Sequence, residues 1–210
     1  MDNTGSFNWT ELAATWGLAV TPPQPERLEE LARWLAERAY PLGFTNYPTA
    51  EALVEHHIVP TLALFRLFPP PLTGRVLDLG AGSGVLGLTL ALLCPDLQVV
   101  LADRRRRSVQ FIRLTVARLG LRNASAEQVG AGAPAKSSPG VFDLVCFRAL
   151  APAAEALRLA GPLLAPGGSV AAWHQSEAAA FLNPPPGWER LATAPTSLPA
   201  LSVSRFRRIS

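Results

Sequence analysis

A glycine-rich turn between a short strand and an apolar helix constrains this chain more than any other feature. Residues 75–79 (RVLDL) are typical of a buried strand, and the loop GAGSG follows them at 80–84. The apolar run 85–94 then has the length of a helix, and a second run, 97–102, has the length of another strand. Asp103 comes directly after it. This order predicts a β-α-β unit with a ligand site at the glycine loop.

The spacing of the glycines alone does not identify the ligand. Gly82, Gly84 and Gly87 also satisfy the G-x-G-x-x-G pattern of dinucleotide-binding proteins, with Asp103 at about the usual distance of 20 residues. The carboxylate of Asp78, two residues before the loop, would however repel a pyrophosphate. S-adenosylmethionine suits it better, because this cofactor has a cationic ammonium and sulfonium, no phosphate, and ribose hydroxyls for Asp103. The residues predicted to bind it are Asp78, Gly80, Ala81, Gly82, Gly84, Asp103 and Arg104.

The glycines have a steric role in this interpretation. Without side chains, they let the backbone approach the cofactor and adopt positive φ angles. The alternative is a tight strand-to-helix turn in an α/β protein with another ligand. We expect no metal site, because Cys94 and Cys146 lie inside apolar runs without C-x-x-C spacing.

Strands and helices continue to alternate after Asp103. The pattern predicts a helix over about 104–119, a weak strand over about 124–129 and a mobile polar loop at 130–140. The C-terminal third, with three prolines at 184–186 and then residues 202–209, predicts a short helix followed by a hairpin. The chain is therefore expected to be α/β, with a doubly wound, mostly parallel, Rossmann-like sheet of the class I methyltransferase type.

Two of the later strands place polar side chains at one edge of this sheet. The buried strand at 141–147 is followed by Arg148, and the strand at 169–173 is followed by His174. The carboxyl ends of parallel strands form the edge where open α/β sheets bind their ligands. Arg148 is therefore a candidate for the reaction centre, and the alternative is a structural salt bridge with an acidic neighbour.

The first part of the chain is expected to be helical. Leucine and tryptophan side chains recur there at helical spacing, and Pro60 should kink or restart the third helix. His56 and His57 are adjacent and cannot share a helix face, which makes a two-histidine metal site improbable. The proline-rich connector before residue 75 divides the chain into an N-terminal helical subdomain, 1–70, packed on a core, 71–210.

Length and composition narrow the class of protein. A chain of 210 residues with 49% hydrophobic residues can bury one substantial core. Its apolar stretches are shorter than the roughly 20 residues of a membrane span, and no basic-then-apolar signal opens the sequence. We therefore expect a cytoplasmic protein without membrane contact, and a monomer.

Arginines concentrate after the second strand of the β-α-β unit. Residues 104–122 contain seven arginines and no acidic residue. Such a surface attracts phosphates, so RNA is a candidate partner, with Arg105, Arg106 and Arg107 as weak candidates for contact. The alternative is an ordinary solvated helix face.

Six stretches together match one family pattern: EALVEHHIVPTLAL, LDLGAGSGVLGLTLAL, PDLQVVLADRRRRSVQFIR, ARLGLRN, FDLVCFRALAP and LLAPGG. In them the chain resembles the glucose-inhibited division protein B family, bacterial methyltransferases that act on guanine N7 of small-subunit ribosomal RNA. The resemblance covers roughly residues 43–173, and FRALAP is more specific than the glycine loop. It implies S-adenosylmethionine as cofactor, Arg148 beside the reaction centre, and His57 as the match of a family histidine. His57 and His174 are further candidates for substrate contact, and the alternative for each is a structural hydrogen-bonding residue.

The chain also departs from the family pattern. Val85-Leu86-Gly87 replaces Phe-Pro-Gly, and Gly43-Phe44-Thr45 replaces an Asn-Leu-Thr motif. Pro60 stands for an aspartate, Gly130-Ala131-Gly132 for Arg-Ala-Glu, and His174 for a lysine. Two other functions therefore stay open: a small-molecule methyltransferase with the N-terminal helices as a lid, and a non-catalytic relative that binds S-adenosylmethionine or RNA.

Overall fold

The computed structural model describes residues 7–129, 141–178, 181 and 183–209. The loop at 130–140, predicted to be mobile, lies outside the described residues, as does part of the segment before the C-terminal hairpin, where a short helix was expected. Within the described part, strands and helices alternate from residue 74 to residue 128 and again from residue 142 to residue 175, as the sequence predicts.

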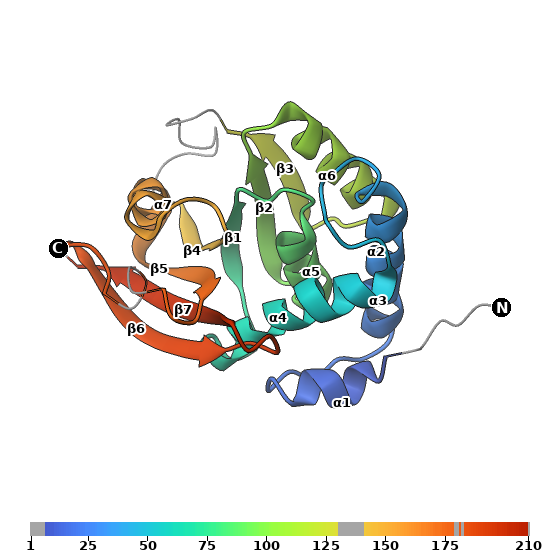
Figure 1. Ribbon diagram of the computed structural model, residues 1–210, viewed down its shortest axis with the longest axis horizontal. Coiled ribbons are helices and arrows are strands. Elements are labelled where there is room, and N and C mark those ends of the chain that lie inside the picture. The colour runs from blue at the N-terminus through green and yellow to red at the C-terminus, as the bar shows by residue number, and fades with distance from the viewer. Residues whose placement is uncertain (1–6, 130–140, 179–180, 182, 210) are drawn as a thin grey trace.

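A seven-stranded sheet in the order β3-β2-β1-β4-β5-β7-β6 forms the centre of the molecule (Figure 1). Its strands are β1 (Gly74–Leu79), β2 (Leu97–Asp103), β3 (Ala124–Gln128), β4 (Phe142–Arg148), β5 (Leu164–Gln175), β6 (Trp188–Pro195) and β7 (Leu201–Arg208). Strands β1 to β5 are parallel, whereas β7 is antiparallel to β5 and to β6. The predicted mostly parallel sheet with a hairpin at one edge is confirmed.

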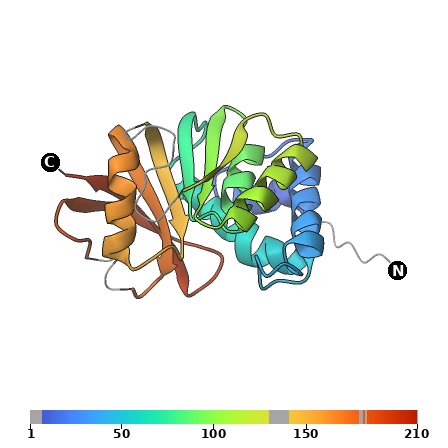
Figure 2. The ribbon, with the colours of Figure 1, turned by 90° about the horizontal axis from the view of Figure 1, so that it is seen from above.

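Helices cover both faces of the sheet. Helices α5 (Val85–Leu93) and α6 (Arg106–Arg118) lie on one face, and α7 (Ala153–Ala160), continued by the 3-10 turn η3 (Gly161–Leu163), lies on the other (Figure 2). Successive strand residues alternate between the two faces. Val76 therefore belongs to the core beneath α5, whereas Leu77 belongs to the core beneath α7. The sheet is doubly wound, as predicted.

The N-terminal segment is helical, as expected. Its elements are α1 (Trp9–Ala14), α2 (Gln24–Arg38), α3 (Ala50–Leu53), the π-helical turn η1 (Val54–Ile58), α4 (Val59–Leu62) and the 3-10 turn η2 (Ala63–Arg66). Pro60 lies in the first turn of α4, directly after the π-helical turn. The chain stays helical through Pro60, so the helix does not restart there; the irregularity at this proline is the π-helical turn directly before it.

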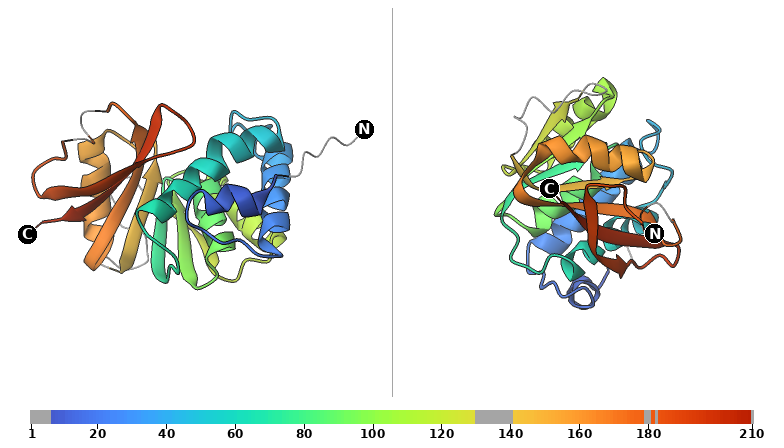
Figure 3. Two further views of the ribbon diagram at one scale, coloured as in Figure 1. Left: turned by 90° about the horizontal axis from the view of Figure 1, so that it is seen from below. Right: turned by 90° about the vertical axis from the view of Figure 1, so that its left-hand side faces the viewer.

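The N-terminal helices pack on the α5 and α6 face (Figure 3), and their last element, η2, contacts β6 of the C-terminal hairpin. The indole of Trp34 donates to the hydroxyl of Thr115 at 3.0 Å, which joins α2 to α6. One hydrophobic core runs from Trp9 in α1 to Val203 in β7. The predicted boundary between an N-terminal subdomain and a core, at residues 70 and 71, falls between η2 and β1. The same hydrophobic core contains residues on both sides of this boundary, and the division into two domains stays a prediction.

Candidate cofactor and substrate site

The strand order reverses between β1 and β4, which are neighbours in the sheet. The chain leaves β1 into the glycine loop, and it leaves β4 after Arg148. Both positions are at the carboxyl ends of parallel strands, at a topological switch point, which is where ligands of this architecture bind. The structure therefore brings the two principal sequence motifs to one edge of the sheet.

The glycines of the loop have different tasks. Gly80, Gly82 and Gly84 all have positive φ, as predicted. A side chain at Gly82 would meet the end of Arg105 at 3.8 Å and the carbonyl of Gly80 at 4.0 Å, both ordinary contact distances, so the loop has room for a ligand there. A side chain at Gly84 would lie 3.0–3.1 Å from Ile112, Leu101 and Leu88. Gly84 thus serves the packing of α5 against the sheet and not ligand access.

Asp103 ties the end of β2 to the glycine loop. Its Oδ2 accepts the amide of Gly82 at 2.9 Å, and its Oδ1 accepts the amide of Arg105 at 2.8 Å and its Nε at 3.3 Å. A carboxylate offers about four acceptor positions, so one remains for a ligand hydroxyl. Of the other predicted contacts, Ala81 donates its amide to the carbonyl of Ala102 at 3.0 Å, and Arg104 is exposed.

Asp78 lies beneath the loop, with 2% of its surface exposed. Its Oδ2 accepts the amide of Gly87 at 2.9 Å, and Gly87 is the third residue of α5. Asp78 therefore caps the first turn of α5, because the residue at the N-cap position, Gly84, has no side chain that could do so. Sequence reasoning directed this carboxylate at the ligand, whereas its hydrogen bond in the structure runs to the helix. Burial is the main cause that raises the pKa of Asp78 to about 7.

Arg148 reaches from the end of β4 to the π-helical turn η1. Its Nη1 donates to the carbonyl of His56 at 2.9 Å and contacts Nδ1 of His57 at 3.0 Å. In an α-helix the amide of residue 60 would donate to the carbonyl of residue 56, but Pro60 has no amide hydrogen. The proline therefore leaves this carbonyl available to Arg148.

Ala149 has a φ of 52°, a left-handed conformation that is uncommon outside glycine.

His57 is held neutral. Burial first, then the charge of Arg148 and the neighbouring His56, lower the pKa of His57 to about 3. A guanidinium only donates hydrogen bonds, so Nδ1 accepts and the proton is on Nε2.

The ring of Tyr47 stacks on His56, with centroids 4.6 Å apart, and meets His57 edge-on at 5.1 Å. Sequence reasoning missed Tyr47, and nothing in its loop segment marks it. The role of the His56 carbonyl could have been found from the proline four residues later.

His174 does not join this cluster. Trp173 is in register with Arg148 and donates its indole N–H to the carbonyl of Pro60 at 2.9 Å. The next residue along a strand faces the opposite side of the sheet. There Nε2 of His174 lies 2.8 Å from the hydroxyl of Ser204, and the imidazole stacks on Phe181. Burial is the main cause that lowers the pKa of His174. The predicted edge is right, but the side chain lies on the other face from Arg148.

The arginine-rich segment is divided between two sides of α6. Arg105 pairs with Asp103, and Arg118 pairs with Glu30 of α2 at 3.3 Å. Arg107 lies over the ring of Phe44, which precedes α3, at 5.6 Å. These three arginines are thus engaged by the protein itself. All seven arginines of the segment are exposed, and of the other four Arg113 donates its Nε to the carbonyl of Ala126 at 3.1 Å.

None of the described helices is long and apolar enough to cross a membrane. Across the described ranges, no three His, Cys, Asp or Glu side chains gather as a metal site would require, and Cys94 and Cys146 are buried free thiols.

Comparison with known sequences identifies related proteins. The family described as rRNA small subunit methyltransferase G matches residues 24–183. A ribosomal RNA small subunit methyltransferase G from Stenotrophomonas maltophilia is 34% identical over 197 residues, which cover 91% of this chain and 88% of the relative. The protein of the same name from Acidothermus cellulolyticus is 35% identical over 155 residues, covering 71% of this chain and 67% of its own.

Solved structures show the same fold. A SAM dependent methyltransferase from Aquifex aeolicus superposes with a TM-score of 0.58 at 15% identity, covering 74% of this chain and 92% of its own. TrmN from Thermus thermophilus has a TM-score of 0.56 at 25% identity, over 71% of this chain and 48% of its own. The class I methyltransferase fold predicted from the sequence is therefore confirmed.

Proposed function

This chain belongs to the rRNA small subunit methyltransferase G family, and from that premise we propose that it transfers a methyl group from S-adenosylmethionine to guanine N7 of 16S ribosomal RNA. The observation that carries the proposal is the position of Arg148. This arginine is held by two hydrogen bonds at the switch point of the sheet, on the strand beside the one that leads into the glycine loop. The family membership supports the class of substrate, and this geometry supports the position of the target base.

S-adenosylmethionine fits the residues of the loop and, when bound, supplies the methyl group. Gly82 leaves the outer side of the loop open, and Asp103 keeps one acceptor position for a ribose hydroxyl. A cationic ligand group near the loop would also favour the ionised form of Asp78, whose pKa is raised to about 7 mainly by burial. We propose Gly80, Ala81, Gly82, Asp103 and Arg104 as the residues around this cofactor, with Asp78 and Gly84 shaping the loop from below.

The reaction at guanine N7 requires little from the protein besides positioning. N7 already has a lone pair, so no strong base is needed, and the main task is to hold the base about 3 Å from the methyl carbon in a site without water. Asp78 and Asp103, the carboxylates beside the loop, are both occupied by backbone amides. They are therefore suited to holding structure and cofactor, and not to proton transfer.

Arg148 is suited to holding the base. Both hydrogens of Nη1 are directed at His56 and His57, which leaves the edge formed by Nε and Nη2. This edge carries two parallel N–H groups and can bind guanine O6 or a phosphate. N7 must keep its lone pair for the methyl group, so the arginine is assigned to O6 or phosphate and not to N7.

We propose that the protein acts in the cytoplasm, where its ribosomal substrate is assembled, and that it acts as a monomer. The departures from the family pattern at Pro60 and His174 are compatible with activity, since Pro60 frees the carbonyl that holds Arg148, and His174 faces away from that arginine.

The test is methyl incorporation by the purified protein into small ribosomal subunits, and into their RNA, from a strain that lacks the enzyme. We expect label at one guanine N7, mapped by cleavage at the modified base and mass spectrometry. Label at another base nitrogen would contradict the N7 assignment and keep the enzyme class. Label only in a small-molecule acceptor would favour the small-molecule methyltransferase, and cofactor binding without turnover would favour a non-catalytic relative.

A further inference from the structure

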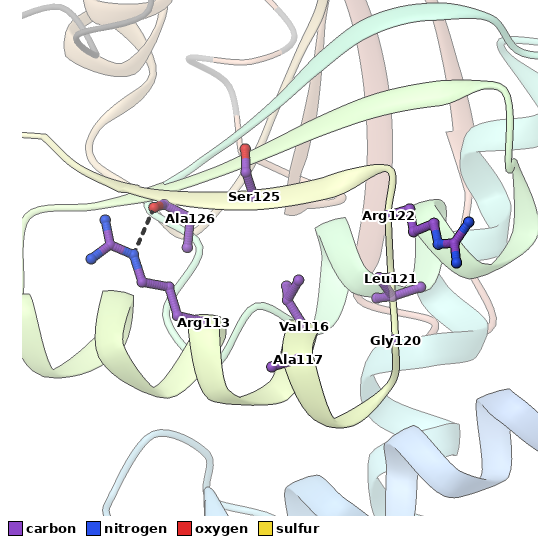
Figure 4. A pocket seen from close by; sticks show the side chains of 8 residues that line it. All are labelled: Arg113, Val116, Ala117, Gly120, Leu121, Arg122, Ser125 and Ala126. Atoms are coloured by element: carbon purple, nitrogen blue, oxygen red, sulfur yellow. Dashed lines mark hydrogen bonds between the residues drawn. The ribbon is translucent and has the colours of Figure 1, made fainter.

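A groove lies between α6 and the edge strand β3, away from the site described above. Its volume is about 450 Å³, and it is lined by Arg113, Val116, Ala117, Gly120, Leu121, Arg122, Ser125 and Ala126. Figure 4 shows Arg113 at one end and Arg122 at the other, with the apolar side chains between them. The groove therefore combines an apolar floor with a cation at each end.

Arg113 is anchored in this groove by the edge strand. The amide of Val99 donates to Asn123, and the amide of Val129 donates to Asp103, so the odd-numbered residues of this strand bond to β2. The carbonyl of Ala126 consequently faces the free edge, where it accepts Nε of Arg113 at 3.1 Å. Figure 4 draws this bond from Nε alone, with the two terminal nitrogens of Arg113 at the outer end of its guanidinium.

A line of exposed residues connects the groove to the cofactor edge of the sheet. Positions separated alternately by four and three residues share one face of a helix. On α6 these positions are Arg106, Gln110, Arg113 and Ala117, and Gly120 follows just after the helix; all five residues are exposed. Arg106 begins α6 directly after β2, hence at the cofactor edge, and Arg113 lies about 10 Å further along the axis at 1.5 Å per residue.

The arginines of this line form no salt bridge with the described part of the protein. Salt bridges with described residues engage Arg105 and Arg118, but not the three arginines along the groove, which are Arg106, Arg113 and Arg122. The segment from 104 to 126 also contains no acidic residue. A surface of this kind attracts phosphates.

We propose that the groove between α6 and β3, together with Arg106, binds the sugar–phosphate backbone of the substrate RNA beyond the target base. This inference rests on the proposed function. The free terminal nitrogens of Arg113 and the side chain of Arg122 bind phosphates, while Val116, Ala117 and Leu121 contact sugar or base. RNA fits better than an acidic protein segment, because the line of cations starts at the edge where the target base must enter.

The experiment measures binding of the full chain to small-subunit ribosomal RNA transcribed in vitro, over a range of salt concentrations. The variants are Arg113→Gln, Arg122→Gln and the double substitution. Arg118→Gln is the matched control, because Arg118 lies on the same helix but pairs with Glu30. Ala117→Glu adds an acid to the groove, and Ala117→Gln controls for its size. Thermal melting and S-adenosylmethionine affinity show that each variant is folded.

Each lost phosphate contact should lower the salt slope by about 0.7–0.9 and weaken binding about fivefold at 0.15 M salt. The double variant should lose about twice as much of the salt slope and should bind RNA about 25-fold more weakly than the wild type. Arg118→Gln should resemble the wild type, and Ala117→Glu should bind more weakly than Ala117→Gln.

Two results would overturn the inference while the proposed function stands. One is an unchanged salt slope in the double variant although the wild type methylates the RNA. The other is binding of oligoglutamate that depends on Arg113 and Arg122 and does not compete with RNA, which would assign the groove to an acidic protein segment. A wild type that binds and methylates no RNA would instead reject the proposed function and the groove together.

Discussion

Nη1 of Arg148 lies 3.0 Å from Nδ1 of His57, and this contact determines where the proton of the imidazole is. The same nitrogen donates to the carbonyl of His56 at 2.9 Å, so both of its hydrogens are used. The guanidinium is thereby oriented from an element 91 residues away in the chain. What remains free of these bonds is the two-point edge of Nε and Nη2, the edge that we assign to the RNA base.

The tautomer of His57 is the first prediction. Because the guanidinium can only donate, we expect Nδ1 of His57 to be unprotonated and Nε2 to carry the hydrogen. Long-range ¹⁵N–¹H spectra distinguish the two nitrogens, and they should show this neutral form unchanged between pH 5 and 8, because the pKa of His57 is lowered to about 3 by burial, Arg148 and His56. The ring nitrogens of His174, observed in the same spectra, serve as an internal comparison for those of His57. A protonated Nδ1 of His57 in that range would contradict the arrangement.

The second prediction concerns stability and pH, and here two buried groups act in opposite directions. The lowered pKa of His57, about 3, means that the unfolded chain binds an extra proton from about 6.5 downward, so this group makes stability fall as pH falls. The raised pKa of Asp78, about 7, means that the folded chain binds the extra proton above about 3.8, so this group makes stability fall as pH rises.

Single variants separate these two contributions. Urea unfolding of Asp78→Asn should show stability rising with pH between about 4 and 6.5, relative to the wild type, because only the histidine term remains. His57→Asn should show the reverse difference in the same window. Parallel curves for the wild type and both variants would mean that neither group titrates as described.

The sequence predicted the elements of the cofactor site because its physical signals are local. A strand, a glycine turn and a helix are encoded within residues 75–94, and the positive φ of Gly82 follows from a turn that other residues adopt only with strain. The hydrogen bond from Gly82 to Asp103 could be expected as well, since parallel strands that are neighbours end at the same edge.

The contacts of Arg148 and His174 depend on non-local geometry that residue patterns do not contain. The register between β4 and β5 shifts between Phe142 and Leu144, so the face that His174 occupies relative to Arg148 could not be counted from the sequence. The π-helical turn around His57 is likewise invisible to a 3.6-residue period. Only the missing amide hydrogen of Pro60 pointed to it.

The third prediction tests Asp103 in cofactor binding. Asp103→Ala removes the acceptor proposed for the ribose and should weaken S-adenosylmethionine and its demethylated product by about 1–3 kcal/mol in calorimetry. Asp143→Ala is a matched control, because the Asp143 carboxylate also accepts a backbone amide, that of Arg75, but at the start of β4 and away from the site. Equal binding by Asp103→Ala and the wild type, or a preference of the wild type for NAD, would reject the cofactor assignment.

The last prediction tests Arg148 as the residue that holds the target base. The substitution Arg148→Lys keeps the positive charge but leaves a single nitrogen. One nitrogen cannot bond to His56 and His57 and also offer two parallel N–H groups to the substrate. Loss of a charged hydrogen-bonding contact to the base is worth about 1.5–3 kcal/mol, so kcat/KM for RNA should fall by about 10- to 100-fold.

The fall should appear mainly in kcat, because the contact is needed most when the base is aligned with the methyl carbon, while S-adenosylmethionine affinity should hardly change. Arg66→Lys is the control, since Arg66 also donates to a backbone carbonyl, that of Thr15, at 2.8 Å but lies outside the site. If cofactor affinity falls as much as kcat, Arg148 belongs to the cofactor pocket. If Arg148→Lys retains full turnover, another group must align the base, and the two hydrogen bonds from Nη1 serve only to fasten β4 to the helix that contains His57.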